Sequence, residues 1–215
     1  MNKSIITVNI DEDIRNQDWL KRPDELMIHD LVSEKLKQRK VEYPTKGENM
    51  DNEPLAKETN LTDVDISPLV FETIVNAPLS KVWEAWSTSE GLSQWMAPLV
   101  EIDLQVGGLM RSNYNQDGKL GDPQTIINTI LSFEPQRMIS IKVTRAPEGF
   151  PFPHAITQMW SIIYFSEVGT NRTSVREVSL GFSPDLESQQ MRAFFNTGNA
   201  STLSQFKQYI DKKAK

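Results

Sequence analysis

The sequence predicts an α+β domain built on an antiparallel sheet, located after about residue 67 of the 215-residue chain. Three observations lead to this prediction. A strand-like segment is followed by two helical segments. Six strand-like segments then succeed one another with turn residues between them and no helix, and a long helical segment comes last. Strands that follow one another without alternating helices are typical of an antiparallel sheet, because parallel neighbours need a long crossover, usually a helix.

The chain divides into two regions of unlike composition. Residues 1–66 hold 15 acidic and 10 basic residues, which account for −5 of the net charge of −6, but only two of the 18 aromatic residues. The other 16 aromatics lie in residues 67–215, where the charges nearly balance. Aromatic side chains supply much of the apolar area of a core. We therefore predict a charged N-terminal extension over residues 1–66 and one folded domain over residues 67–215.

The extension contains two short patterned segments. Residues 4–10 are rich in β-branched residues. Ile28, Val32 and Leu36 recur at the spacing of an amphipathic helix, which Pro23 would begin. An apolar stripe this narrow cannot form a core alone, so the segment either docks on the domain or on a partner, or remains undocked.

The domain is expected to begin with a strand over residues 69–76 and a pair of helices. Pro78 stands at the tolerated first position of a helix that runs through Trp86. Residues 87–90 have the spacing of a capping box, which predicts that Ser87 begins a second short helix running through Trp95.

The remaining strands are marked by turn residues such as Gly107, Gly118 and Gly149. A Ser-Pro-Asp sequence at residues 183–185 then precedes the long helix, predicted over residues 186–212. The six predicted strands cover residues 99–106, 109–115, 125–133, 138–145, 156–166 and 173–182.

This order of elements, together with several of its motifs, resembles the START-like superfamily, also called SRPBCC or Bet v 1-like. The resemblance rests on residues 71–95, on the strand that ends at Val106-Gly107-Gly108, and on residues 133–138. Within the superfamily, the chain is most similar to the group named after the activator of heat-shock protein 90 ATPase. The resemblance covers about residues 69–212, and the extension has no counterpart in it.

The resemblance implies a helix-grip fold, in which a curved seven-stranded antiparallel sheet wraps around the long C-terminal helix and leaves an apolar cavity between them. A strongly bent sheet cannot close fully on one helix, and the space between layers is where small-molecule sites form. Family members often carry a large aromatic where this chain has Asn199, next to Gly198. The small residues here are expected to widen the cavity or kink the helix.

Composition excludes several kinds of chemistry. The absence of cysteine excludes disulfides, thiolate zinc sites and Cys nucleophiles, and it suits a reducing compartment, so we predict a cytoplasmic location. A pI near 5.1 argues against nucleic acid as a partner, because phosphate binding needs clustered Lys and Arg. No apolar run is long enough to span a membrane. His29 and His154 are isolated and no phosphate-binding glycine motif occurs, so no metal or cofactor is predicted.

The side chains of the last predicted strand alternate between the two faces of the sheet. Val175, Glu177 and Ser179 share one face, which by resemblance meets the helix and the cavity. A carboxylate buried there needs a partner or a raised pKa. The alternative is a small register error that leaves Glu177 solvated. The candidate partners are Arg111, Tyr114, Gln158 and Arg192.

The long helix and neighbouring strands supply the other candidates. Phe195, Asn199, Leu203 and Phe206 recur at helical spacing and are expected to face the sheet. The residues predicted to line a pocket are Trp95, Tyr114, Ile141, Met159, Ser161, Glu177, Ser179, Phe195, Asn199 and Leu203.

The opposite face of the sheet also carries apolar side chains. Trp160, Ile162 and Tyr164 alternate with inward-facing residues, and apolar patches of some size are rarely left bare. We expect either the N-terminal extension, docking in cis, or a second copy in a homodimer to cover them.

Three functions remain open at this stage. The leading interpretation is a non-enzymatic domain that binds an apolar small molecule, since no nucleophile, metal or cofactor motif is present. The second is an enzyme of the polyketide-cyclase or hydrolase kind, with Glu177 or Tyr114 as the acid or base. The third is a co-chaperone or protein-interaction module of the heat-shock protein 90 activator type.

Overall fold

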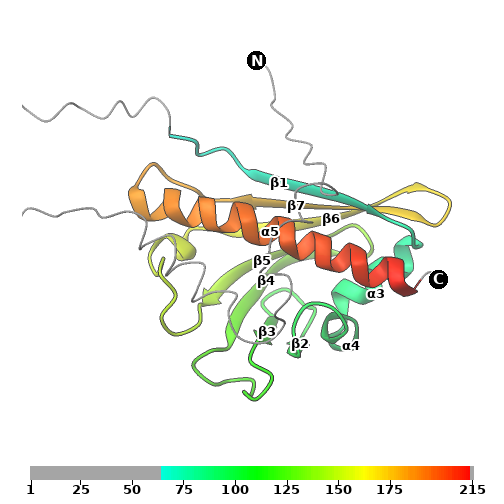
Figure 1. Ribbon diagram of the computed structural model, residues 1–215, viewed down its shortest axis with the longest axis horizontal. Coiled ribbons are helices and arrows are strands. Elements are labelled where there is room, and N and C mark those ends of the chain that lie inside the picture. The colour runs from blue at the N-terminus through cyan, green and yellow to red at the C-terminus, as the bar shows by residue number, and fades with distance from the viewer. Residues whose placement is uncertain (1–63, 214–215) are drawn as a thin grey trace, which may run out of the picture.

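The computed structural model describes residues 64–213, which form a seven-stranded antiparallel sheet wrapped around one long helix (Figure 1). The predictions for residues 4–10 and for the helix after Pro23 lie outside the described residues. The elements are β1 (Leu69–Val75), α3 (Leu79–Ser87), α4 (Ser89–Ser93), β2 (Leu99–Ile102), β3 (Leu109–Asn113), β4 (Ile126–Glu134), β5 (Met138–Arg145), η3 (Ala155–Thr157), β6 (Trp160–Gly169), β7 (Arg172–Leu180) and α5 (Leu186–Lys213).

The strands pair in the order β1-β7-β6-β5-β4-β3-β2, and every pair is antiparallel. The first strand therefore lies beside the last, and the sheet ends at β1 and β2. Strand β4 has register irregularities between Ile127 and Asn128 and between Ile130 and Ser132. Irregularities of this kind bend a strand and increase its twist. The α+β class and the helix-grip arrangement predicted from the sequence are confirmed.

Most predicted boundaries differ from the structure by a few residues, and three of the differences have a clear physical reason. Helix α4 is capped by Thr88 rather than Ser87, because the Thr88 hydroxyl oxygen accepts the Gly91 N–H at 3.0 Å. The strand predicted from residue 99 ends at Ile102, since the chain then turns sharply. Residues 155–157 form a single helical turn, which the Thr157 hydroxyl closes by donating to the His154 carbonyl at 2.7 Å, so β6 begins only at Trp160.

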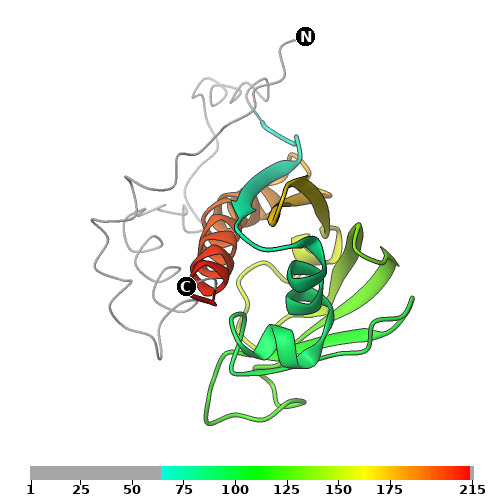
Figure 2. The same ribbon diagram turned by 90° about the vertical axis from the view of Figure 1, so that its right-hand side faces the viewer.

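Helix α5 packs mainly against β1 and η3, while the strands β2–β4 curve away from it (Figure 2). Two apolar clusters hold it in place. The first, which we call the helix-pair cluster, lies beneath α3, α4 and the C-terminal half of α5. Its centre is three rings, Trp86, Trp95 and Phe206, whose centroids lie 4.6 to 5.3 Å apart.

The second cluster, which we call the loop cluster, packs the first half of α5 against the segment around η3. Its buried members are Leu69, Phe152, Ala155, Ile156, Met159, Phe182 and Met191. Phe150, Phe194 and Phe195 pack against it from the edge with rings at steep angles, an arrangement that aromatic pairs favour. The two clusters therefore fix both ends of α5.

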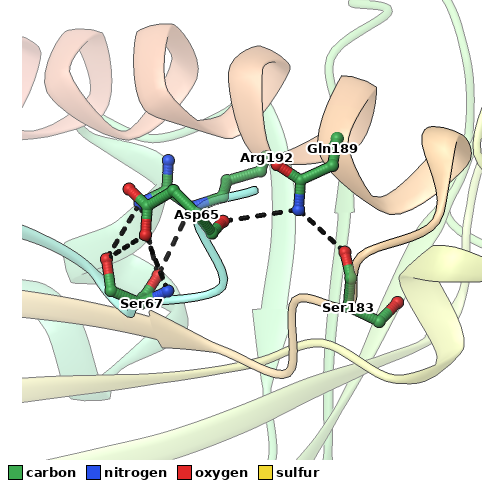
Figure 3. A network of polar contacts seen from close by, with 5 residues as sticks. All are labelled: Asp65, Ser67, Ser183, Gln189 and Arg192. Atoms are coloured by element: carbon green, nitrogen blue, oxygen red, sulfur yellow. Dashed lines mark hydrogen bonds and ion pairs between the residues drawn. The ribbon is translucent and has the colours of Figure 1, made fainter. Parts of the chain in front are cut away.

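A polar network ties the segment before β1 to α5 (Figure 3). The Arg192 guanidinium forms an ion pair with Asp65 at 2.7 Å and also donates to the Ser67 carbonyl. Gln189 donates to the carbonyls of Asp65 and Ser183. Further along, the Lys207 ammonium donates to the Ile74 carbonyl at 3.0 Å. Side chains of α5 thus bond to the segment just before edge strand β1 and to one carbonyl within it, which covers part of that edge.

The packing of α5 predicts a clear contrast between two leucines. Leu203 is 1% exposed within the helix-pair cluster, whereas Leu186 is 67% exposed at the start of the same helix. Leu203→Ala should lower the free energy of unfolding by about 2–5 kcal/mol, because it removes buried methyl groups and leaves a cavity. Leu186→Ala should change it by less than about 0.5 kcal/mol. Denaturant unfolding measures both, and equal effects would mean that α5 does not pack as described.

Gly198 offers a stabilising change in the same helix. A methyl group at this position would meet nothing within 4 Å, so Gly198→Ala adds no clash. Glycine inside a helix costs up to about 1 kcal/mol relative to alanine. The variant should therefore raise the free energy of unfolding by about 0.5–1 kcal/mol. A loss of stability would show that the backbone at residue 198 is not regular helix.

Candidate functional site

The concave face of the sheet carries a polar band between the two apolar clusters. Register places Ser161 beside Ser179 and Ile163 beside Glu177 on neighbouring strands. Asn199 faces them from α5, and all four polar positions of this band are buried. We call Ser161, Glu177, Ser179 and Asn199 the polar belt.

Three members of the belt bond to one another. The Ser161 and Ser179 hydroxyl groups lie 2.9 Å apart. The Asn199 side-chain amide donates to the Ser179 hydroxyl oxygen, also at 2.9 Å. This chain joins β6, β7 and α5, so it fixes the helix to the sheet at the middle of the concave face. Hydrogen bonds of this kind compensate for most of the free energy that buried polar groups lose when they leave water.

Glu177, the fourth member, differs because its carboxylate has no partner among the described residues. The residue is 8% exposed, and no hydrogen bond or ion pair joins its side chain to any of residues 64–213. In this range the wholly buried side-chain polar atoms that lack a partner are Trp86 Nε1 and Asp211 Oδ1. The Glu177 oxygens are not among them, so they retain a small accessible surface. Burial raises the pKa of the Glu177 carboxyl to about 7.

Of the four partners suggested by the sequence, three are engaged elsewhere. Arg111 pairs with Glu101, Arg192 pairs with Asp65, and the Gln158 amide donates to the Thr157 hydroxyl. The fourth is Tyr114. Burial raises the pKa of the Tyr114 hydroxyl, and the negative charge of Glu177 raises it further. The two groups therefore lie close enough to interact, although no direct hydrogen bond joins them.

Tyr114 lies far from Glu177 in the strand order, yet the charge of Glu177 influences it. Tyr114 follows β3, which lies four strands away from β7, so the curvature of the sheet accounts for this influence. Tyr114 is 49% exposed, so much of the residue is in contact with water, although burial and the charge of Glu177 raise the pKa of its hydroxyl.

A neighbouring asparagine fixes the position of Tyr114, and the sequence analysis did not identify it. The buried Asn113 side chain accepts the Asn115 N–H and donates to an Asp122 oxygen at 2.8 Å. Asp122 also accepts from the Thr125 hydroxyl. The signal for this turn was the run of Asn, Asp and Gly residues after β3, since these side chains bond to nearby backbone.

The other predicted site residues lie in the apolar clusters on either side. Trp95 is buried in the helix-pair cluster, where its ring nitrogen donates to the Ala85 carbonyl at 3.0 Å. Leu203 is buried in the same cluster, and the partly buried Ile141 packs against that cluster. Met159 is buried in the loop cluster, and Phe195 packs at its margin.

Two hollows of the described residues lie away from the polar belt. One, of about 300 Å³, is lined by the end of β5 and the segment up to Thr157. The other, of about 580 Å³, lies between α3, α4 and the C-terminal end of α5. Neither contains a predicted site residue, so neither is the enclosed apolar cavity that the resemblance implies.

With this geometry established, the chain can be compared with known proteins. Residues 76–211 match the family model described as Activator of Hsp90 ATPase homolog 1-like protein. The chain belongs to this family. It has no match among curated proteins.

Solved structures similar to this family member show the same fold. A protein of Arthrobacter aurescens has a TM-score of 0.53 at 14% identity, covering 70% of this chain and 89% of its own. A protein of Mesorhizobium loti has a TM-score of 0.52 at 19% identity, with 67% and 97% covered. The Aha1 dimer of Colwellia psychrerythraea has a TM-score of 0.50 at 18% identity, with 66% and 95% covered. Likeness at these identities establishes the fold alone.

Two further properties of this family member concern residues 64–213. No helix there combines the length and the apolar character that crossing a membrane requires. Within the same part of the chain, no group of three or more His, Asp or Glu side chains is placed to hold a metal ion.

The unpaired carboxylate predicts an unusual dependence of stability on pH. The pKa of Glu177 rises from 4.5 to about 7 on burial, so the folded protein binds this proton more tightly than the unfolded chain does. The contribution of Glu177 to the free energy of unfolding is therefore greatest below about pH 4.5 and is lost as the pH rises to about 7. The loss is on the order of 3 kcal/mol.

Glu177→Gln should remove this dependence. At pH 8 the variant should be more stable than the natural chain by an amount of that order, and at pH 4.5 the two should be alike. Denaturant unfolding between pH 4.5 and 8 measures the difference. Glu167→Gln, a change at an exposed position of β6, is the control and should leave the pH dependence unaltered. A Glu177→Gln curve parallel to the natural one would show that the carboxylate is solvated or paired.

Proposed function

We propose that this domain binds a small molecule with an apolar body between α5 and the concave face of the sheet, and that it does so without catalysis. The observation that carries the proposal is Glu177, a buried carboxylate with no hydrogen-bond or ion-pair partner among residues 64–213. An unpaired buried charge is costly, and strongly perturbed groups of this kind gather at functional sites.

The surroundings of Glu177 support binding in two ways. Its neighbours in register are Phe71 on β1 and Ile163 on β6, which offer apolar contact to a ligand body. Tyr114, half exposed just after β3, offers a ring and a hydroxyl group. A few convergent polar groups among apolar walls are typical of small-molecule sites. The polar belt would orient the ligand, and the two clusters would hold the walls apart.

A second function, acid–base catalysis, is favoured by one specific observation. A general base works best when its pKa lies near the operating pH, and burial places the pKa of Glu177 at about 7. Tyr114 would then be the second polar group on the substrate. Binding is preferred because no hydrogen-bonded pair of nucleophile and base involves Glu177 among the described residues. Solvent exchange of a labelled proton in the bound molecule would favour catalysis.

The apolar fluorescent probe N-phenyl-1-naphthylamine tests binding by the full chain. We expect its emission to rise on addition of the natural protein, and native mass spectrometry of freshly expressed protein should reveal a small molecule that departs on denaturation. Asn199→Phe should abolish both signals, because it fills the space beside the polar belt. Asn196→Phe, the same change at an exposed position of α5, should leave them intact.

Two results would contradict the proposal. The first is a natural protein that neither carries a small molecule nor binds the probe. The second is binding that Asn199→Phe leaves unchanged while circular dichroism shows that the variant is folded, because the probe would then occupy another surface.

A further inference from the structure

Resting on the proposed function, we infer that the ligand carries a protonated amine that pairs with Glu177 beside Tyr114. The geometry supplies the argument. Among residues 64–213 the carboxylate has no hydrogen-bond or ion-pair partner, it keeps a small accessible surface, and it shares a strand face with Ser179, which is bonded to Ser161 and Asn199. A cationic group entering beside Glu177 would meet an unpaired acceptor, with Tyr114 near enough to be influenced by its charge.

No cation of the described chain already serves this carboxylate. On the adjoining strands, Glu72 accepts from Ser174 and Arg176 lies over the Tyr164 ring on the convex face. On α5, Glu187 accepts backbone N–H groups near η3, and Arg192 and Lys207 are engaged along β1. Arg111, beyond Tyr114 in the sheet, pairs with Glu101. The interior site thus presents one negative charge without a fixed counter-ion.

An ammonium group suits the shape and chemistry of this site. It donates three hydrogen bonds, and both Glu177 and the Tyr114 hydroxyl oxygen accept. The half-exposed Tyr114 ring also attracts a cation over its face. Two opposite charges attract each other much more strongly at low effective dielectric than in water. A protonated amine therefore gains binding free energy from Glu177 that an alcohol of equal size does not gain. A ligand carboxylate would be repelled by the same charge.

The main alternative is that Glu177 is neutral and donates a hydrogen bond to a ligand carbonyl. The dependence of binding on pH distinguishes this alternative from pairing with an amine. Ionisation of Glu177 strengthens the pairing with an amine and removes the donor that a carbonyl needs. Amine binding should therefore tighten as the pH rises from 6 to 8, whereas carbonyl binding should weaken over the same interval. Tyr114 is the titratable group that faces Glu177 within the site, and it stays protonated across this interval because its pKa is raised.

The test uses three probes with one eight-carbon chain, n-octylamine, 1-octanol and octanoate, each displacing N-phenyl-1-naphthylamine from the full chain at pH 6 and pH 8. At pH 8 we expect octylamine to bind at least about tenfold more tightly than octanol, and octanoate to bind most weakly. The preference for the amine should be smaller at pH 6. Glu177→Gln should remove the preference for the amine, and Glu167→Gln should preserve it.

The other possible outcomes contradict either the amine inference alone or the proposed function as well. If octanol binds as tightly as octylamine, or octanoate binds best, the amine inference is wrong while the proposed binding function stands. If the amine preference survives Glu177→Gln, the cation binds elsewhere and the inference is again wrong. If N-phenyl-1-naphthylamine does not bind or none of the three displaces it, both the inference and the proposed function fail.

Discussion

The structure depends on how α5 is held against the curved sheet. The helix is fixed near its two ends by separate apolar clusters, one under the helix pair and one against the segment around η3. Between them its contact with the sheet is polar, through the hydrogen bonds that join Ser161, Ser179 and Asn199. Apolar packing at the ends supplies most of the stability, since area removed from water is the dominant favourable term in folding. The middle is therefore free to hold groups that a packed core would exclude.

Glu177 illustrates what this arrangement permits. Its strand neighbours place it on the concave face, between the two apolar clusters. A residue with the same burial inside a continuous core would be replaced by an apolar one, because nothing compensates the lost hydration. Here the apolar packing at both ends of α5 offsets the free-energy cost of burying this carboxylate. Ligand recognition is the role that we propose for this residue.

Much of the fold could be predicted from the sequence because the signals are local. Turn residues marked the strand ends, and the alternation on β7 correctly placed Glu177 and Ser179 on one face. The pairing of Glu177 could not be predicted in the same way. Arg111 and Arg192 were reasonable partners by residue type, but each has an acidic partner that only the folded chain reveals. The approach of Tyr114 follows from sheet curvature, which depends on the irregular register of β4 and has no simple sequence signature.

The central claim is that Glu177 is a buried, unpaired carboxyl group inside the concave face. Carbon-13 NMR titration of its side-chain carboxyl in the full chain tests this claim most directly, with Glu177→Gln identifying the resonance. We expect a single titration with a pKa of about 7, well above the ordinary value of 4.5. A pKa at or below 4.5 would contradict it, because the carboxylate would then be solvated or paired with a cation, and neither the proposed site nor its ligand class would have a physical basis.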